Sequence, residues 1–96
     1  MADNSGSNIV NASKIIIQGI TSNGEIFRPS DWAERISGRL ATFRNQRVIY
    51  SPLLRPGVKE GHKCVIVDVT LQESHPDLYE YLMGFAKENG LVVFWE

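Results

Sequence analysis

The stretch from residue 27 to residue 43 constrains the fold most, because its apolar residues recur at helical spacing. Five of them fall within roughly one third of a helical wheel: Trp32, Ala33, Ile36, Leu40 and Phe43. Pro29 suits the first position of a helix, where its missing N–H would have no partner. We therefore expect an amphipathic helix from Pro29 to about residue 44 or 45, with its apolar stripe against a core; the alternative register has Ser30 as the N-cap.

The start of this helix predicts specific contacts. In this register Phe27 packs against Trp32 as a hydrophobic staple. Asp31 lies in the first turn, where the helix dipole favours an anion, and it forms an i,i+4 pair with Arg35. We assign Trp32 to the core and expect a carbonyl of residues 27–29 to accept its indole N–H.

Length and composition predict one domain. The chain has 96 residues, of which 43% are hydrophobic, and a chain of this size buries about 60–65% of its unfolded surface. Residues 1–13 are rich in Asn, Ser, Asp and Gly without a period, which predicts a disordered N-terminal tail. Residues 14–96 then form a single α+β domain.

The remaining elements follow from short patterns. Strands are expected over residues 14–20, 47–54, 63–71 and 91–95, the second at a sheet edge because Pro52 removes a ladder donor. Residues 21–24 form a turn, and residues 25–27 pair back briefly. The prolines and glycines of residues 55–61 predict a loop. A second helix runs from Pro76 to Glu88, with Gly84 projecting outward and Asn89-Gly90 as its stop.

This order of elements is that of a ferredoxin-like βαββαβ sandwich, in which two helices cover one face of an antiparallel four-stranded sheet. The first and third strands would be central and the second and fourth would lie at the edges. The alternative is another α+β arrangement in which residues 15–28 form a true hairpin.

Cysteine use and hydropathy predict a cytoplasmic protein. Cys64 is the single cysteine, which fits a reducing compartment. The first residues do not resemble a secretory leader, and no apolar run approaches the ~20 residues that span a bilayer. We expect no membrane association.

The net charge of −1 hides an asymmetry. Residues 28–63 contain eight basic side chains against three acidic ones, whereas residues 64–96 contain one against six. A basic segment of this kind is a candidate surface for an anionic partner. Weak nucleic-acid binding through residues 28–63, including Arg35 and Arg39, is therefore the alternative function. The other explanation is that the two halves attract each other within the domain.

Residue patterns for catalysis and cofactors are absent from the sequence. The expected central strands, residues 14–20 and 63–71, lack the aromatic residues on which an RNA-recognition sheet stacks bases. His62, Cys64 and His75 do not form two closely spaced ligand pairs, so we predict no metal site. No helix start or basic cluster would activate the thiol. We expect no enzyme and no cofactor.

The sheet face that two helices cannot cover is the remaining candidate. If Val65 and Val67 face the helices, Ile66 faces outward together with Ile16 of the first strand. An exposed apolar patch of this sort marks a protein contact, so we expect a protein partner or a weak homodimer. The alternative is that residues 1–13 or the long loops cover this face.

Three segments carry a family resemblance. They read Phe27-Arg28-Pro29-Ser30-Asp31-Trp32-Ala33-Glu34-Arg35, Tyr50-Ser51-Pro52 and Phe85-Ala86-Lys87-Glu88-Asn89. They resemble the short proteobacterial proteins of domain-of-unknown-function family 3579 over about residues 14–93. The resemblance implies a small bacterial cytosolic protein and brings no catalytic residues or cofactors with it. Arg28 and Asp31 are the polar residues of the first segment that packing explains least, so we take them as candidate contact residues.

Overall fold

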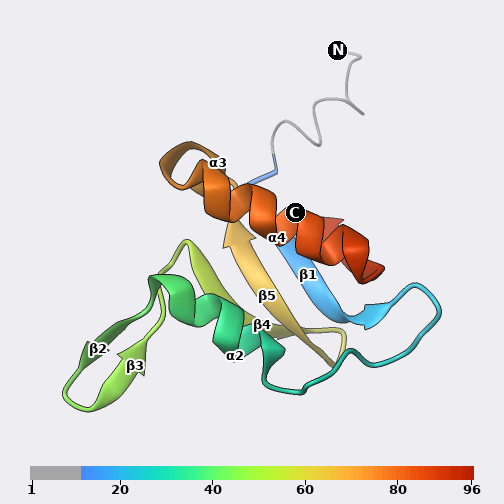
Figure 1. Cartoon of the computed structure of the whole chain (residues 1–96), viewed down its shortest axis with the longest axis horizontal. Coiled ribbons are helices and arrows are strands. Elements are labelled where there is room, and N and C mark those ends of the chain that lie inside the picture. Colours follow the sequence, from blue (N-terminus) through green and yellow to red (C-terminus); the bar gives the residue numbers. More distant parts are fainter. Residues whose placement is uncertain (1–11) are drawn as a thin grey trace.

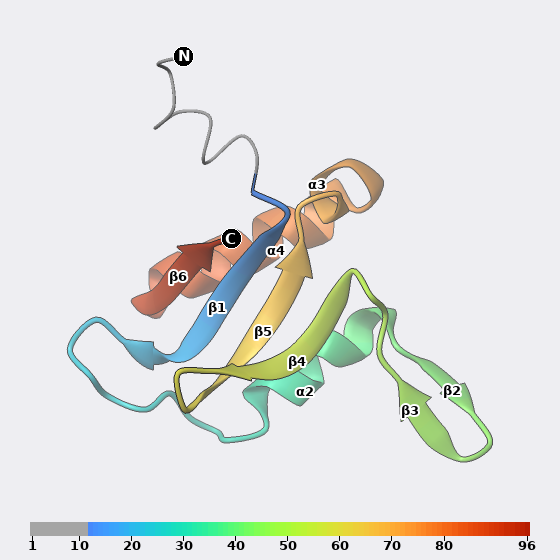
Figure 2. The same cartoon turned by 180° about the vertical axis from the view of Figure 1, so that it is seen from behind.

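The computed structural model describes residues 12–96, and its centre is an antiparallel sheet of four strands (Figures 1 and 2). The strands occur in the order β4-β5-β1-β6, and each neighbouring pair is antiparallel. Their bounds are Lys14–Thr21 for β1, Leu54–Lys59 for β4, His62–Asp68 for β5 and Leu91–Trp95 for β6.

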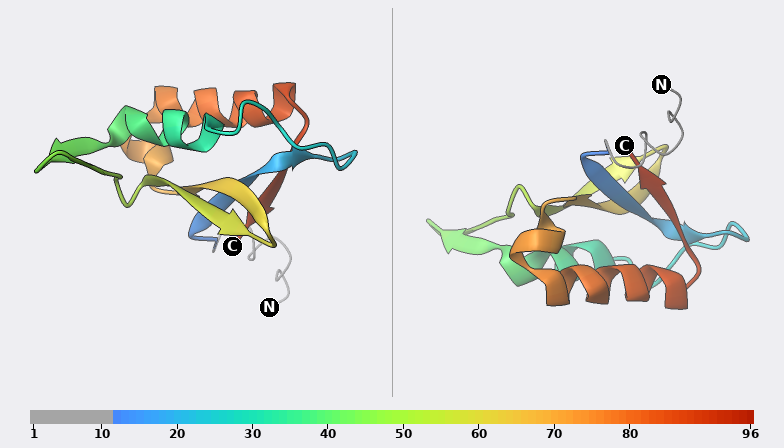
Figure 3. Two further views of the ribbon diagram at one scale, coloured as in Figure 1. Left: turned by 90° about the horizontal axis from the view of Figure 1, so that it is seen from below. Right: turned by 90° about the horizontal axis from the view of Figure 1, so that it is seen from above.

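Helices cover one face of this sheet, and Figure 3 shows the two layers edge-on. Helix α2 spans Trp32–Ser37 and continues as a 3-10 turn over Gly38–Leu40. Helix α3 spans Leu71–Ser74 and leads into the longer α4, Pro76–Glu88. The side chains between the two layers form the core.

Two further strands form a separate hairpin. Among residues 12–96, β2, Thr42–Arg44, pairs only with β3, Arg47–Ile49, and Figures 1 and 2 show the pair projecting from the body beyond the end of α2. All six strand residues are exposed. The hairpin therefore adds nothing to the core.

Alternation along the central strands determines which side chains enter the core. Ile15 pairs with Val67 and Ile17 with Val65, and all four are buried beneath the helices. Because successive strand residues point to opposite faces, Ile16 lies on the other face of β1. The predicted assignment of the valines to the helix side is confirmed.

Several predicted elements are confirmed. The sheet is antiparallel with four strands, and α4 has the predicted bounds, with Asn89 as its C-cap and Gly90 at φ +64°. The predicted ferredoxin-like βαββαβ order is not confirmed, because the described residues form six strands and contain α3 in addition. Residues 25–27 do pair back briefly, through a bridge between Ile20 and Ile26.

The prediction of one helix from Pro29 to residue 44 or 45 is wrong at both ends. α2 begins at Trp32 and ends at Ser37, and Phe43, predicted on the apolar stripe, is 70% exposed on β2. Asn45 and Gln46 both have positive φ, 52° and 63°, as a two-residue hairpin turn requires. Asparagine tolerates this conformation well, so the local turn and the strand pairing prevail over the helical spacing.

The predicted second strand and loop are only partly right. Residues 47–49 of the predicted strand form β3, but outside the four-stranded sheet. The edge strand is β4, which begins at the last residue of the predicted strand and runs through most of the predicted loop. It contains Pro56, which an edge strand tolerates because one side of its backbone has no partner. Glu60 and Gly61, at φ 54° and 81°, turn the chain directly into β5. β5 ends at Asp68, because its carboxylate accepts the N–H of Thr70 at 2.9 Å and starts a turn towards α3.

The predicted tail lies outside the described residues except at its last two positions. Ala12 is buried, and the backbone N–H of Ser13 donates to the carbonyl oxygen of Glu96 at 2.8 Å. The carbonyl of Ser13 accepts the N–H of Val69 at 3.0 Å. Within residues 12–96, none of the helices has the length and apolarity needed to cross a membrane.

Candidate functional site

The helix groove is an open pocket of about 230 Å³ between α2 and α4. Residues of α2 and of the segment just before α2 line one side of the groove, and two aromatic residues of α4 line the other side. The lining residues are Phe27, Pro29, Trp32, Arg35, Ile36, Tyr81 and Phe85. The groove is therefore mainly apolar, with one charged residue at its rim.

Three aromatic rings form the floor of the helix groove. Phe27 meets Trp32 edge-on with ring centres 5.7 Å apart, and Phe85 stacks on Trp32 at 6.0 Å. The predicted contact between Phe27 and Trp32 is thus confirmed, although the helix begins later than predicted. No hydrogen bond joins the indole N–H of Trp32 to residues 27–29 in the described structure, so that prediction is wrong. The indole edge lies against Gly19 of β1 instead.

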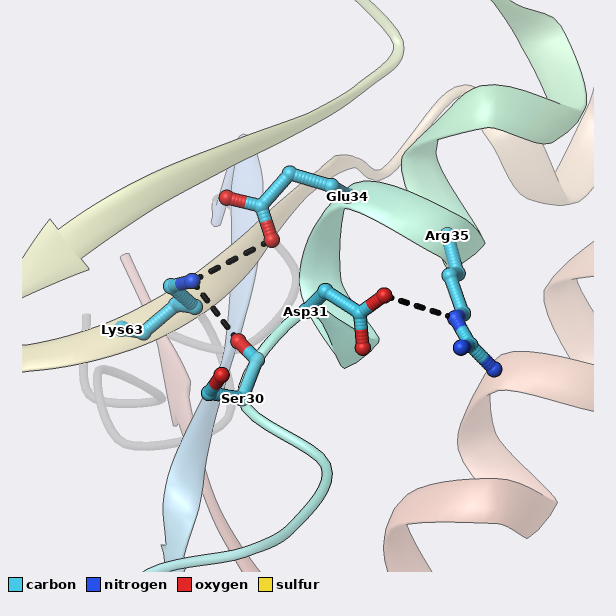
Figure 4. A network of polar contacts seen from close by, with 5 residues as sticks. All are labelled: Ser30, Asp31, Glu34, Arg35 and Lys63. Carbon is cyan, nitrogen blue, oxygen red and sulfur yellow. Dashed lines mark hydrogen bonds and ion pairs between the residues drawn. The ribbon is translucent and has the colours of Figure 1, made fainter.

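Two arginines lie along the α2 side of the groove. Arg35 Nε donates to Asp31 Oδ2 at 2.9 Å, so the predicted i,i+4 pair is confirmed (Figure 4). The guanidinium of Arg39 lies over the ring of Tyr81, 4.4 Å from its centre. Both cations therefore already have partners within the chain.

Lys63 fastens the start of α2 to the sheet. Its ammonium donates to the carbonyl of Ser30 at 2.7 Å and to Glu34 Oε1 at 3.2 Å, on the side of the helix away from Arg35 (Figure 4). Because the ion pair is partly exposed, its contribution to stability is small. It leaves Lys63 less available to an external anion.

A second hollow, the α4 notch, lies next to the helix groove. It is an open pocket of about 230 Å³ between Glu80 and Glu88, which stand one turn before and one turn after Gly84. A Cβ at residue 84 would meet no atom within 4 Å, so the backbone is accessible there. Tyr81 and Phe85 line both hollows, which makes them one continuous surface.

The β2–β3 hairpin exposes large apolar side chains. Phe43 is 70% exposed, and Val48 and Ile49 are also exposed. Phe43 lies directly opposite Val48, so the two share one face of the hairpin. Arg44 lies opposite Arg47 beside the turn. The hairpin thus combines an apolar face with two adjacent positive charges.

The open sheet face is less accessible than its apolar residues suggest. Ile16 is 6% exposed, Ile66 is half-buried, and Cys64 is fully buried. Lys59 forms an ion pair with Glu96 and lies over the ring of Phe94, 4.8 Å from its centre.

Gln18, also on this face, donates to the carbonyl of Lys59 at 2.7 Å. Because β4 and β6 are the two edges of the sheet, the contacts of Lys59 reach across this face. The chain's own side chains therefore cover part of the surface predicted for a partner.

Cys64 and Asp68 have shifted pKa values, each for a local reason. Burial raises the pKa of the Cys64 thiol, and the charges of Arg55 and Lys59 offset this only in part. Hydrogen bonds from the Thr70 hydroxyl and backbone hold the pKa of Asp68 below its usual range. Among residues 12–96 no three His, Cys, Asp or Glu side chains are close enough to share a metal ion.

The structure brings together only some of the predicted site residues. Asp31, Arg35 and Arg39 lie along one edge of the helix groove, and Arg28 is exposed in the segment before α2. Ile16 and Ile66 lie on the opposite face of the sheet, so the six candidates do not form one site.

Sequence reasoning missed the exposed hairpin and the aromatic groove. The available signal was Asn45-Gln46 between two short runs of strand-forming residues, Thr42-Phe43 and Val48-Ile49. A turn there would have placed Phe43 on a strand and removed it from the helix. The helical spacing from Trp32 to Phe43 concealed this signal.

Comparison with known proteins adds a structural relative. A solution structure described as the first structural representative of its family is 42% identical to this chain, with a TM-score of 0.77, and the match covers 88% of this chain and 80% of that one. None of the curated proteins matches the chain. The model of the family described as "Protein of unknown function (DUF3579)" matches residues 11–95, and this protein belongs to that family.

Proposed function

We propose that this protein is a non-enzymatic protein-interaction module whose contact surface is the β2–β3 hairpin. The observation that carries the proposal is the exposure of Phe43, Val48 and Ile49 on an arm that projects from the body (Figure 2). Single exposed apolar residues are ordinary, but several gathered on one projecting element are typical of a protein contact.

The hairpin's own stability supports this proposal. A two-stranded hairpin without a covering layer is only marginally stable in water. β2 and β3 pair only with each other in the described structure, so each also has an outer edge with unpaired backbone groups. A partner that packs on Phe43 and Val48 would remove these apolar groups from water and stabilise the arm.

Capture experiments with matched variants test the proposal. The tagged wild-type chain, Phe43→Ser and Val58→Ser serve as baits in bacterial lysate. Val58 is the control because it is 73% exposed on β4, close to the 70% of Phe43, but lies outside the hairpin. We expect a protein, either another chain or a second copy, to be retained by wild type and Val58→Ser and lost from Phe43→Ser.

The outcome that contradicts the proposal is equally specific. A retained protein that binds Phe43→Ser as well as wild type would place the contact elsewhere. Both substitutions are on exposed residues, so thermal unfolding of each variant should differ from wild type by less than about 0.5 kcal/mol. This comparison separates lost binding from lost folding.

Weak nucleic-acid binding through residues 28–63 is the alternative function. It is favoured by Arg44 and Arg47, which lie side by side on a hairpin that has no carboxylate. It is disfavoured by the ion pairs of Arg35, Lys59 and Lys63 with Asp31, Glu96 and Glu34.

Salt dependence tests this alternative. Binding through phosphates should weaken steeply with salt, and each lost phosphate contact should reduce the slope by about 0.7–0.9. Unchanged DNA and RNA mobility at low salt would discard this function. So would binding that is the same in wild type and in Arg44→Ala with Arg47→Ala.

We also infer that the four-stranded sheet is a ferredoxin-like core into which the β2–β3 hairpin is inserted. The supporting observation is that β1 and β5 are central while β4 and β6 lie at the edges. In this interpretation residues 14–96 form one domain, and the hairpin is an insertion that leaves the sheet order unchanged. The single cysteine supports a reducing, cytoplasmic compartment for it.

A further inference from the structure

We propose that the outer edge of β6 is a second interaction surface, on which a second copy of this chain adds its own β6. The two sheets then form one continuous antiparallel sheet in a two-fold dimer, with the two α4 helices side by side. This surface lies outside the β2–β3 hairpin, so the inference goes beyond the proposed function and can fail without it.

The outer edge of β6 carries unpaired backbone groups. Lys14 and Glu96 exchange two backbone hydrogen bonds, of 2.9 and 2.8 Å, which makes them a hydrogen-bonded pair. Such pairs alternate with non-hydrogen-bonded ones, so Val93 and Trp95 direct their N–H and C=O groups away from β1. Within residues 12–96 none of these groups has a hydrogen-bond partner. Figure 2 shows β6 as the outermost strand at this edge.

The other edge of the same sheet is protected. The N–H of Asp68 donates to the carbonyl of Leu53 at 3.0 Å, so alternation along β4 turns the backbone of Pro56 outward. Pro56 has no N–H to offer there, and Lys59 adds a charge. Edge strands avoid pairing by such means, whereas β6 contains neither proline nor charge. Pairing at β6 alone gives a closed dimer and no filament.

β6 is suited to pair with itself. In the antiparallel register centred on Val93, this residue lies opposite its own copy and Trp95 lies opposite Leu91. The outward-directed groups of Val93 then meet those of the second copy. On the other side of the sheet, Val92 lies opposite Phe94. Every cross-strand pair is apolar, and aromatic–β-branched pairs stabilise a sheet.

The flank of α4 above this edge is apolar as well. Tyr81 and Phe85 line the helix groove towards α2, and Leu82 is buried against the sheet. Helical spacing therefore places Tyr79 and Met83 on the flank away from α2, where both are half-buried. Because α2 contacts β4 and β5 while α4 contacts β6, this flank faces the β6 edge. Pairing of the strands brings two such flanks together.

Charges on α4 favour a second copy as the partner. Counted from Gly90, Val93 and Met83 both lie about 10 Å along their elements, at ~3.3 Å per strand residue and ~1.5 Å per helical residue. A two-fold axis through Val93 therefore passes close to Met83. Glu80 and Lys87 lie on either side of Met83 along the helix, so antiparallel α4 helices place Lys87 of each copy beside Glu80 of the other. Neither has an ion-pair partner within residues 12–96.

Sedimentation velocity over a concentration series tests the strand pairing. We expect wild type to dimerise. Val93→Pro should raise the dissociation constant about tenfold or more, because it removes an outward N–H from both copies at the centre of the contact. Val58→Pro is the matched control, since Val58 also directs its backbone away from the sheet, on β4, and it should leave the dimer intact. Thermal unfolding of each variant confirms that the chain is folded.

A charge exchange on α4 tests the helix contact with β6 unchanged. Lys87→Glu places two carboxylates side by side at each end of the helix pair and should weaken the dimer about threefold or more. Glu80→Lys with Lys87→Glu should recover it, because the facing charges are again opposite. This recovery cannot arise from net charge alone, since the exchange leaves the net charge equal to that of wild type.

Four results would overturn the inference. They are a wild-type chain that stays monomeric at every concentration, a folded Val93→Pro chain that dimerises as well as wild type, loss of the dimer in folded Val58→Pro, and an exchange variant as weak as Lys87→Glu. Phe43→Ser should dimerise like wild type. A dimer lost in Phe43→Ser but kept in Val93→Pro would place the contact on the hairpin, which overturns this inference and supports the proposed function.

Discussion

Trp32, the first residue of α2, lies directly against Gly19 of the central strand β1. A Cβ placed on Gly19 would be 2.6 Å from Nε1 of the indole and 3.0 Å from Cζ2. Real side chains do not approach this closely, so residue 19 must lack a Cβ for the indole to rest on the strand. The contact fixes the distance between the start of α2 and the sheet.

Gly19→Ala should therefore destabilise the fold by about 1–3 kcal/mol, the usual cost of overpacking. The reason is that the rigid indole cannot move aside without leaving the core. Gly57→Ala is the matched control, because its Cβ would meet the movable Cδ1 end of Ile66, also at 2.6 Å. Chemical denaturation should show a smaller loss for Gly57→Ala, and equal losses would mean that the indole yields as readily as an isoleucine tip.

Trp32→Ala should cost about 3–5 kcal/mol of the free energy of unfolding. The side chain is 4% exposed and contacts both Phe27 and Phe85, so its removal leaves a cavity between the two layers. A domain whose total stability is about 5–15 kcal/mol would become marginal. Thermal unfolding measures the effect, and a melting temperature close to wild type would contradict the assignment of Trp32 to the core.

Gly84→Ala should stabilise the protein by about 1 kcal/mol, because alanine has the higher helix propensity. The new Cβ would meet no atom within 4 Å, so no strain opposes this gain. Gly90→Ala should have the opposite effect, since residue 90 has φ +64° at the end of α4. Differential scanning calorimetry should show one rise and one fall in melting temperature, and a fall for both would exclude an open site at residue 84.

Asp68 should make stability depend on pH in the acid range. Hydrogen bonds from the hydroxyl and N–H of Thr70 lower its pKa in the folded state below the ordinary value of 3.8. A group with a lowered folded pKa contributes stability above its unfolded pKa, and this is lost as pH falls through the folded pKa.

Wild type should therefore be more stable than Asp68→Asn at neutral pH, and this advantage should shrink below about pH 4. Urea unfolding at several pH values measures the difference. A constant difference from neutral to acid pH would show that the carboxylate's charge has no part in holding the turn.

The sequence predicted those helices and strands that form from patterns within one segment. It did not predict a strand that forms only when a neighbouring strand supplies hydrogen bonds. α4 followed from its apolar stripe, Pro76 at its start and Asn89-Gly90 at its end, all within one segment. The central strands followed from dense β-branched residues around Ile16 and Ile66. The edge strand β4 did not, because Arg55, Pro56 and Gly57 favour a strand only when β5 supplies hydrogen bonds on one side.

The candidate site was predictable only in its parts. The pair of Asp31 and Arg35 follows from helical spacing alone. The helix groove joins α2 to α4, which are far apart in the chain, so no local pattern could place Tyr81 and Phe85 beside Trp32. The open sheet face is partly shielded by the ion pair between Lys59 and Glu96, and this pair forms only when the strands are assembled.

The sequence by itself determined the family, the antiparallel sheet with its helices, and the burial of Trp32. These depend on residue spacing and hydrophobicity, which act within short segments. Only the tertiary structure determined that residues 41–49 contain a hairpin and do not continue the helix. Their helical spacing would have placed Phe43 in the core, yet Phe43 contributes nothing to it. Helix α2 is shorter than two turns, and after Leu40 the chain pairs across the Asn45-Gln46 turn in a hairpin outside the four-stranded sheet, so strand pairing prevails over the helical spacing.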